Sequence, residues 1–223
     1  MIAAGDRIAV GLSGGKDSAA LLYALVHMRR FYPQPYELVA VSVDPGFPGG
    51  EELFAPVSAF CASLGVEHRL VRTGIYGVVF GERKEKNPCS LCAKMRRGAL
   101  SSEAVSAGAN RLALGHHMDD AAATFLMSLT TAGRIGCFSP VTVYEDRGLS
   151  VIRPLIYCRE REIRALVRAA GIPTVKNPCP ADGGSERTET EELLRELDRR
   201  HRGVYARIIG AMERAGVDGW KDS

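Results

Sequence analysis

The sequence predicts an α/β protein built on a doubly wound, mostly parallel sheet, with a small helical part at the C-terminus. Five apolar runs rich in β-branched residues alternate with stretches whose apolar residues have helical spacing. Strand alternating with helix requires crossover connections, which favour a parallel sheet covered by helices on both faces. With 223 residues, 46% of them hydrophobic and 25% charged, the chain is long enough to bury a substantial core.

The expected elements follow one another in a regular order. We expect strands at residues 7–12, 36–44, 68–73, 111–116 and 150–155. We expect a helix that begins near Gly15 and further helices at residues 51–64, 89–107, 119–131 and 159–170. From Pro173 the pattern changes to a loop rich in proline and glycine, a charged helix and a short amphipathic helix that ends near Gly216. We therefore expect an α/β domain at residues 1–172 and a C-terminal appendage, packed on it, at residues 173–223.

The composition excludes several classes of protein. No run of about eighteen uncharged apolar residues is present, so a membrane span is not expected. No signal peptide is visible, and we therefore expect a cytoplasmic protein. In that compartment the six cysteines favour metal or redox chemistry over a disulfide framework. Three of them, Cys61, Cys137 and Cys158, lack a motif and are expected to pack in apolar surroundings.

A glycine-rich turn, Ser13-Gly14-Gly15-Lys16-Asp17-Ser18, joins the first expected strand to the first helix. Glycines let the backbone approach a phosphate closely, and the amides of a first helical turn bind anions. Lys16 adds a positive charge, and the hydroxyls of Ser13 and Ser18 can donate hydrogen bonds. Asp17 could hold Mg²⁺ against the phosphates. The turn resembles the SGGxDS loop of the PP-loop ATP pyrophosphatases, which implies ATP cleavage between the α and β phosphates and adenylation of a substrate oxygen.

Other polar residues stand at the ends of later strands, where ligands of such sheets collect. Asp44 could reach a ribose or adenine edge, or it could simply end its strand. The segment Gly115-His116-His117-Met118-Asp119-Asp120 resembles the GHxxDD motif of the same superfamily. We expect Gly115, His116 and Asp120 beside the nucleotide and Asp119 in proton transfer or Mg²⁺ binding, although two carboxylates in a first helical turn also satisfy the helix dipole. Arg153 could neutralise phosphate charge or pair with a carboxylate.

Three cysteines have a pattern that suits a metal site. Cys89 and Cys92 form a CxxC pair at a helix start, where backbone amides favour the thiolate. Cys179 repeats the Asn-Pro-Cys sequence of Cys89 further along the chain and could return to the same crevice. Three thiolates without an obvious fourth ligand suit a [4Fe–4S] cluster with one open iron. They would also suit Zn²⁺ with a water or a histidine.

The segment NPCSLCAKMRRGAL at residues 87–100, with the strand-end motifs and Cys179, resembles the iron–sulfur tRNA 2-thiocytidine synthetases over residues 7–202. The resemblance implies an ATP-dependent tRNA sulfurtransferase that adenylates the oxygen of an anticodon-loop cytidine and replaces it with sulfur delivered on a [4Fe–4S] cluster. It implies Cys89, Cys92 and Cys179 as the cluster ligands. The expected catalytic residues are Asp119, Lys16 and Arg96, the last beside the reacting base. Many members carry a further cysteine where this chain has Asp182.

A basic segment surrounds the CxxC pair. Residues 82–97 carry a net charge of +4, whereas the whole chain carries +3. A solvated basic loop is one interpretation, and contact with the phosphate backbone of tRNA is the other. The expected tRNA contacts are Arg83, Lys84, Lys86, Lys94 and Arg97. The implied partners are tRNA and a sulfur donor, either a cysteine desulfurase or free sulfide, and a homodimer would help so small a chain cover an anticodon arm.

Two other functions are compatible with these residues. Without a cluster, the same ATP chemistry would suit a tRNA-modifying ligase or amidase whose cysteines bind structural zinc, and an iron-free anaerobic preparation would favour it. A nucleotide-sensing module would bind ATP without catalysis. Failure to release pyrophosphate with any tRNA would favour that function.

Overall fold

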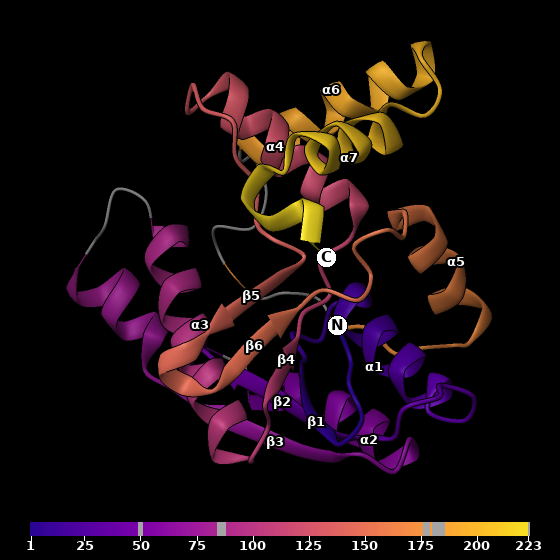
Figure 1. The fold of residues 1–223 in the computed structure, drawn as a ribbon. Coiled ribbons are helices and arrows are strands. Elements are labelled where there is room, and N and C mark those ends of the chain that lie inside the picture. The colour runs from indigo at the N-terminus through magenta and orange to yellow at the C-terminus, as the bar shows by residue number, and fades with distance from the viewer. Residues whose placement is uncertain (49–50, 84–87, 176–178, 180–185, 223) are drawn as a thin grey trace.

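The computed structural model describes residues 1–48, 51–83, 88–175, 179 and 186–222. Six strands form one sheet in the order β3-β2-β1-β4-β6-β5 (Figure 1). Their bounds are β1 Asp6–Gly11, β2 Tyr36–Asp44, β3 Glu67–Arg72, β4 Arg111–Ala113, β5 Val141–Tyr144 and β6 Leu149–Ile152. All neighbouring strands are parallel except β5, which is antiparallel to β6. The predicted mostly parallel α/β sheet is confirmed.

Helices cover both faces of this sheet and its carboxyl edge. Their bounds are α1 Lys16–Met28, α2 Ala55–Ser63, α3 Pro88–Ser106, α4 Met118–Thr130, α5 Glu160–Ala169, α6 Glu186–Arg200 and α7 Val204–Ala215. Short turns of helix occur at Glu51–Phe54, Gly77–Glu82, Glu145–Arg147 and Val217–Asp222. Within the described ranges, no helix has both the length and the apolar character needed to cross a lipid bilayer.

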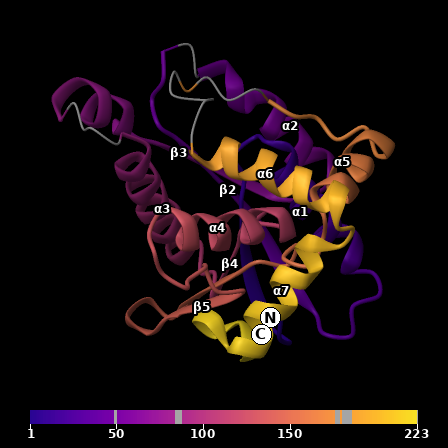
Figure 2. The same ribbon diagram turned by 90° about the horizontal axis from the view of Figure 1, so that it is seen from above.

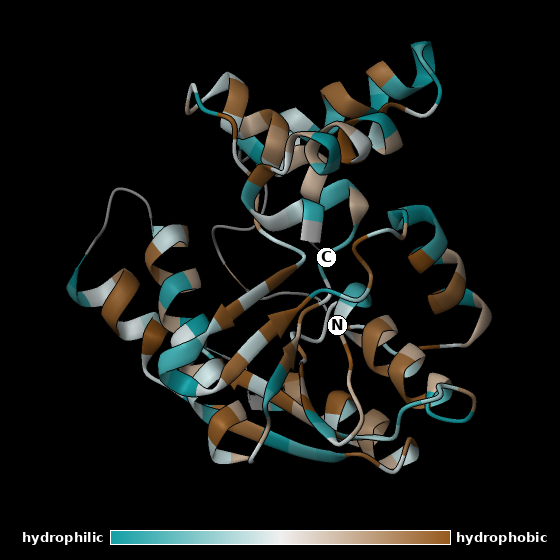
Figure 3. Cartoon of the chain, viewed as in Figure 1, coloured by the Kyte–Doolittle hydropathy of each residue, from teal (hydrophilic) through white to brown (hydrophobic). Residues whose placement is uncertain are grey.

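Alternation of side chains along β1 explains why both faces are covered. Ile8 and Val10 point to a cluster formed with α1, α2 and α5, whereas Ala9 points to a cluster formed with α3. All three residues are fully buried, as expected for a central strand with helices on either side. Figure 2 shows α3 on the side of the sheet opposite α1 and α2, and in Figure 3 the central strands and α1 are predominantly hydrophobic.

The C-terminal helices form a layer with α4 beyond the carboxyl ends of the strands (Figure 1). Ala122 and Ala123 of α4 pack with Leu194 of α6 and Tyr205 of α7. Trp220, which follows α7 and is almost fully buried, donates its indole N–H to the Phe138 carbonyl at 3.0 Å. Residues 186–222 therefore share a core with α4. Together with α4 they cover the carboxyl edge of the sheet, where ligands are expected.

Two elements were not expected from the sequence. The edge strand β5 forms a hairpin with β6, and a helical turn with Gly148 at a φ of 59° connects them. The π-helix at Gly77–Glu82 was also missed. The expected strand at residues 150–155 ends early, at Ile152, since Pro154 has no N–H to donate to a ladder. The strand expected at residues 111–116 ends at Ala113.

Candidate functional site

A crevice of about 510 Å³ lies where the order of the strands reverses, between the carboxyl ends of β1 and β4. Parallel α/β sheets bind ligands at this switch point. Its apolar walls include Leu12, Val43 and Leu114. The crevice brings together nine residues expected at the site from the sequence: Ser13, Asp17, Ser18, Arg96, Arg97, Gly115, His116, Asp120 and Arg153. These residues come from four separate parts of the chain.

The glycine-rich turn has the geometry expected of an anion-binding loop. Gly15 is the extended residue before α1, and Gly14 has a φ of 83°, which only glycine adopts without strain. Ser18 closes the turn because its hydroxyl donates to the Gly15 carbonyl at 3.0 Å and accepts from the Ser13 N–H at 3.2 Å. Gly15, the N-cap residue, has no side chain that could accept a hydrogen bond from the first amides of α1, so these amides have no side-chain cap.

Gly115 lets the two nucleotide motifs approach each other. A Cβ atom at this position would lie 2.9 Å from the backbone carbon of Asp17 and 2.9 Å from the backbone nitrogen of Ser18. Backbone atoms cannot move aside as a flexible side chain can. The GHHMDD segment therefore fits against the start of α1 only with glycine at position 115.

Three buried polar atoms in the crevice lack a hydrogen-bond partner among the described residues: Asp17 Oδ1, His116 Nδ1 and Arg153 Nε. Such atoms are costly unless a ligand satisfies them. Burial, with a further contribution from Arg153, lowers the pKa of His116 to about 4, so that its imidazole is neutral near pH 7. Arg153 is only 8% exposed, and burial lowers its pKa as well. The crevice thus presents polar groups to a bound molecule.

Arg153 is held in place from the hairpin side. Its Nη1 donates to the Ser139 carbonyl and to Thr142 Oγ1, and its guanidinium lies 5.0 Å from the centroid of the Phe138 ring. Among the described residues, Arg153 Nε has no hydrogen-bond partner and the guanidinium has no carboxylate partner. The predicted contact of Arg153 with a phosphate stays a prediction.

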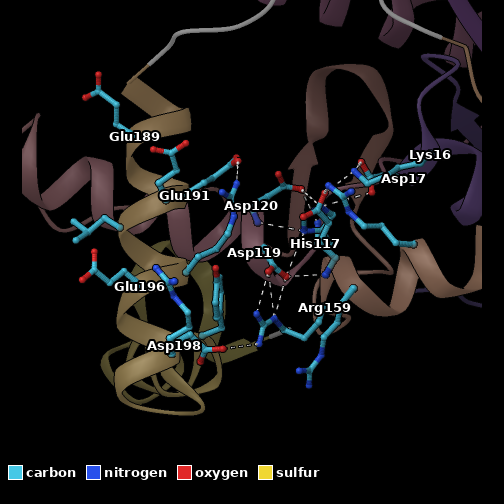
Figure 4. A pocket seen from close by; sticks show the side chains of 18 residues that line it. Lys16, Asp17, His117, Asp119, Asp120, Arg159, Glu189, Glu191, Glu196 and Asp198 are labelled. Atoms are coloured by element: carbon cyan, nitrogen blue, oxygen red, sulfur yellow. Dashed lines mark hydrogen bonds and ion pairs between the residues drawn. The ribbon is translucent and has the colours of Figure 1, made fainter.

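Lys16 points away from this crevice into a neighbouring charged groove of about 1160 Å³ between α5 and α6 (Figure 4). Its Nζ lies 2.8 Å from Glu160 Oε1 and 3.0 Å from Asp17 Oδ2. Burial alone would lower the pKa of Lys16, but these two hydrogen bonds outweigh it and the pKa is raised. Burial would likewise raise the pKa of Glu160, whereas hydrogen bonds from Lys16 and Arg164 lower it to about 2. Without ATP, Lys16 is therefore paired with α5.

Asp119 faces the same groove and is already occupied by protein donors. It accepts hydrogen bonds from Arg159 Nε at 3.1 Å and from the Glu160 backbone N–H at 2.8 Å. Arg159 in turn lies over the Tyr205 ring at 3.7 Å. This carboxylate joins the start of α4 to α5 and so has a positioning role, while its part in proton transfer or Mg²⁺ binding stays a prediction.

Asp120 and Asp44 also have protein partners. Asp120 Oδ2 accepts the His117 backbone N–H at 2.9 Å in a capping box, and its Oδ1 accepts a hydrogen bond from Arg187 of α6. Asp44 Oδ1 accepts the Gly46 N–H at 2.8 Å and does not line the crevice. Asp44 thus stabilises the turn at the strand end, and its contact with a nucleotide stays a prediction.

Two of the three motif cysteines lie on α3, the helix that lines one side of the crevice. Cys89 is exposed and Cys92 half-buried in the first turns of α3, and Ala93, the next residue, lines the crevice. Burial raises the pKa of Cys92, Arg96 lowers it, and Cys179 and Cys89 both raise it by their charge. Cys179 therefore returns close enough to act on Cys92. Burial is the largest of these contributions, so the pKa of Cys92 is raised overall, and an effect of the helix amides on the thiolates stays a prediction.

The described part of the chain contains no group of three His, Cys, Asp or Glu side chains close enough to hold one metal ion. Whether Cys89, Cys92 and Cys179 hold an iron–sulfur cluster or a zinc ion therefore stays a prediction from the sequence.

The sequence of the chain matches the PP-loop domain family over residues 3–194. This chain belongs to the PP-loop family. The tRNA-cytidine(32) 2-sulfurtransferase of Cronobacter sakazakii is 38% identical over 215 residues, which cover 96% of this chain and 69% of that protein. The protein of the same name from Geobacter sulfurreducens is 37% identical and is covered to 83%. The U34-tRNA thiolase NcsA from Methanococcus maripaludis, solved with its [4Fe-4S] cluster, superposes with a TM-score of 0.81 at 26% identity, covering 99% of this chain and 74% of that one. The predicted resemblance is confirmed.

The basic segment of this PP-loop protein surrounds the crevice. Arg96 and Arg97 line it, and Lys94 is exposed on α3. Arg83 is exposed just before the gap in the described residues, and Lys84 and Lys86 lie outside the described residues. Arg83, Lys94 and Arg97, the predicted tRNA contacts that the structure describes, thus lie on α3 or close to it in the sequence.

Sequence reasoning missed three charged residues of the site: Arg159, Glu160 and Arg187. Each contacts a motif residue from a distant helix. Arg159 and Glu160 stand at a predicted helix start, but no local pattern indicated which residues they would meet. Their partners follow from the packing of α5 and α6 around α4.

Proposed function

We propose that this chain is an ATP-dependent tRNA sulfurtransferase that replaces O2 of a cytidine with sulfur, the cytidine at position 32 being the substrate named for its relatives. The observation that carries the proposal is that α3, the helix with the CxxC pair, lines the same crevice as the nucleotide motifs. Ala93, Arg96 and Arg97 line it just after Cys92, and the charge of Cys179 raises the pKa of Cys92. The same crevice holds unpartnered polar atoms suited to a nucleotide.

ATP would bind with its phosphates on the Ser13–Ser18 loop. The amides at the start of α1 would hold the leaving pyrophosphate as its negative charge develops, which is the usual electrostatic contribution of such loops. Lys16 would exchange Glu160 for the phosphates. Asp17 would bind Mg²⁺ through Oδ1, the oxygen without a hydrogen-bond partner. Arg153 Nε and neutral His116 would donate to or orient the nucleotide.

The base must enter the crevice from outside, as in other enzymes that modify a base. Its O2 attacks the α-phosphorus, pyrophosphate leaves, and the base oxygen then departs with AMP when sulfur bonds to C2. Arg96 lines the crevice one turn after Cys92, where it would lie beside the reacting base. Arg83, Lys84, Lys86, Lys94 and Arg97 would contact the phosphate backbone of the tRNA.

Cys89, Cys92 and Cys179 would hold a [4Fe–4S] cluster. When bound, the cluster would carry the sulfur atom that is transferred, with a cysteine desulfurase or free sulfide as the donor. Thiolates are the ligands that such clusters require, and the U34-tRNA thiolase that this chain resembles was solved with a [4Fe-4S] cluster. A homodimer would extend the basic surface over an anticodon arm.

Anaerobic reconstitution with iron and sulfide, followed by reaction with ATP and unmodified tRNA, tests the proposal. Nucleoside mass spectrometry is expected to find 2-thiocytidine, and iron analysis to find a cluster. Cys179→Ala should lose both. The matched control is Cys158→Ala, a half-buried thiol packed beside the core that should keep both. Thiolation by iron-free protein would refute the cluster, and zinc without thiolation would support the ligase alternative.

A further inference from the structure

The chain between α5 and α6, which carries Cys179, is attached to a nucleotide motif on its N-terminal side. The Val175 backbone N–H donates to the Gly14 carbonyl at 2.8 Å. A Cβ atom at Gly14 would lie 3.2 Å from Val175 Cβ, so the two segments are in close contact. The chain thus leaves the phosphate-binding turn four residues before Cys179.

On its C-terminal side the same chain is attached to the second nucleotide motif. Arg187, the second residue of α6, donates from Nη2 to Asp120 Oδ1, and its Nε donates to Glu191 at 3.2 Å. Asp120 lines the crevice, and its side chain is 19% exposed. The contact joins residues 67 positions apart in the sequence. Arg187 therefore ties the start of α6 to a carboxylate at the nucleotide site.

We infer that Arg187 is a positioning residue, and that its ion pair with Asp120 couples occupancy of the nucleotide crevice to the placement of Cys179. The inference rests on the proposed nucleotide and cysteine sites. A ligand that draws Asp120 toward the crevice changes the bond to Arg187, and α6 begins a few residues after Cys179. Coupling of this kind is reciprocal, so that a group held by Cys179 must change ATP affinity by the same factor as ATP changes the affinity for that group.

The test uses the full-length, metal-free, reduced protein and follows alkylation of Cys179 by iodoacetamide through peptide mass spectrometry. In the wild type, MgATP should change the rate by about fivefold or more, the usual size of such coupling. Arg187→Ala should react at the same rate with and without MgATP. Arg187→Lys, which keeps the charge, should retain part of the response and shows that the effect does not come from loss of folding.

The matched control is Arg200→Ala on the same helix. Arg200 makes a hydrogen bond to Glu196 one turn before it, as Arg187 does to Glu191 one turn after it, but its side chain is 70% exposed, whereas that of Arg187 is 40% exposed and also contacts Asp120. It should respond to MgATP like the wild type. An Arg187→Ala protein that keeps the full response would overturn the inference.

Calorimetry with MgATP on the same samples separates the two proposals. If the wild type binds MgATP and the Cys179 rate does not change, the coupling is refuted while the proposed function stands. If it binds no MgATP, both are refuted. A second readout is the ATP dissociation constant, which should differ between cluster-loaded and metal-free wild type and be equal for the two forms of Arg187→Ala.

Discussion

Replacement of Asp119 by asparagine distinguishes a positioning role from proton transfer. The carboxylate accepts hydrogen bonds from the Glu160 N–H at 2.8 Å and from Arg159 Nε and Nη2 at 3.1 and 3.2 Å. The side chains of Asp119 and Arg159 are largely buried, at 16% and 17% exposed. A hydrogen bond to a charged group contributes about 1.5–3 kcal/mol. The side-chain oxygen of an asparagine can still accept a hydrogen bond from one of these donors, and Arg159 retains its contact with the Tyr205 ring.

We therefore expect Asp119→Asn to lower the free energy of unfolding by about 2–3 kcal/mol. For a chain of this length each kcal/mol corresponds to about 2–4 °C in Tm, so the Tm should fall by about 4–12 °C. Differential scanning calorimetry at pH 7 measures the shift. The control is Asp146→Asn, since the Asp146 side chain is 75% exposed and 3.7 Å from Arg147. That variant should remain within about 0.5 kcal/mol of the wild type.

The opposite pattern would refute this reasoning. A proton-transfer group contributes about 10²–10⁴-fold to the rate. If Asp119→Asn melts at the wild-type temperature while thiolation falls by about a hundredfold or more, then Asp119 acts in the chemistry and its bonds to α5 are incidental.

Three further predictions follow from other contacts of the site. The pKa of Glu160 is lowered from 4.5 to about 2. The ionised Glu160 therefore stabilises the folded protein fully above pH 4.5, and this contribution is lost as the pH falls toward 2. Urea unfolding should show Glu160→Gln less stable than the wild type at pH 6, with the difference disappearing by about pH 2. Gly115→Ala places a Cβ atom 2.9 Å from the backbone of α1 and should weaken ATP binding by about tenfold at an overpacking cost of about 1–3 kcal/mol, whereas Gly98→Ala, with nothing within 4 Å, should bind ATP normally in the same calorimetric titration. Arg83→Glu with Lys84→Glu should weaken tRNA binding and reduce its salt dependence without changing ATP hydrolysis; filter binding across a salt titration checks this, and an unchanged affinity would contradict the proposed tRNA surface.

The sequence alone was sufficient for the features that depend on neighbours along the chain. The hydrogen bonds that shape the phosphate turn join Ser13, Gly15 and Ser18, and the capping box joins His117 to Asp120. A strand, a glycine turn and a helix start are encoded within a few residues, because their hydrogen bonds close short rings. For the same reason the alternation of strands and helices predicted the sheet.

Only the tertiary structure decided what the charged motif residues contact. Lys16 is paired with Glu160, Asp119 with Arg159 and Asp120 with Arg187, in each case through a helix far along the chain. An ion pair depends on the distance between two charges in space, and hydrophobic periodicity places helices on a sheet without stating which polar side chains will meet. The residue types of the site are thus encoded in short local motifs, whereas the partners of their charged side chains are determined by tertiary packing.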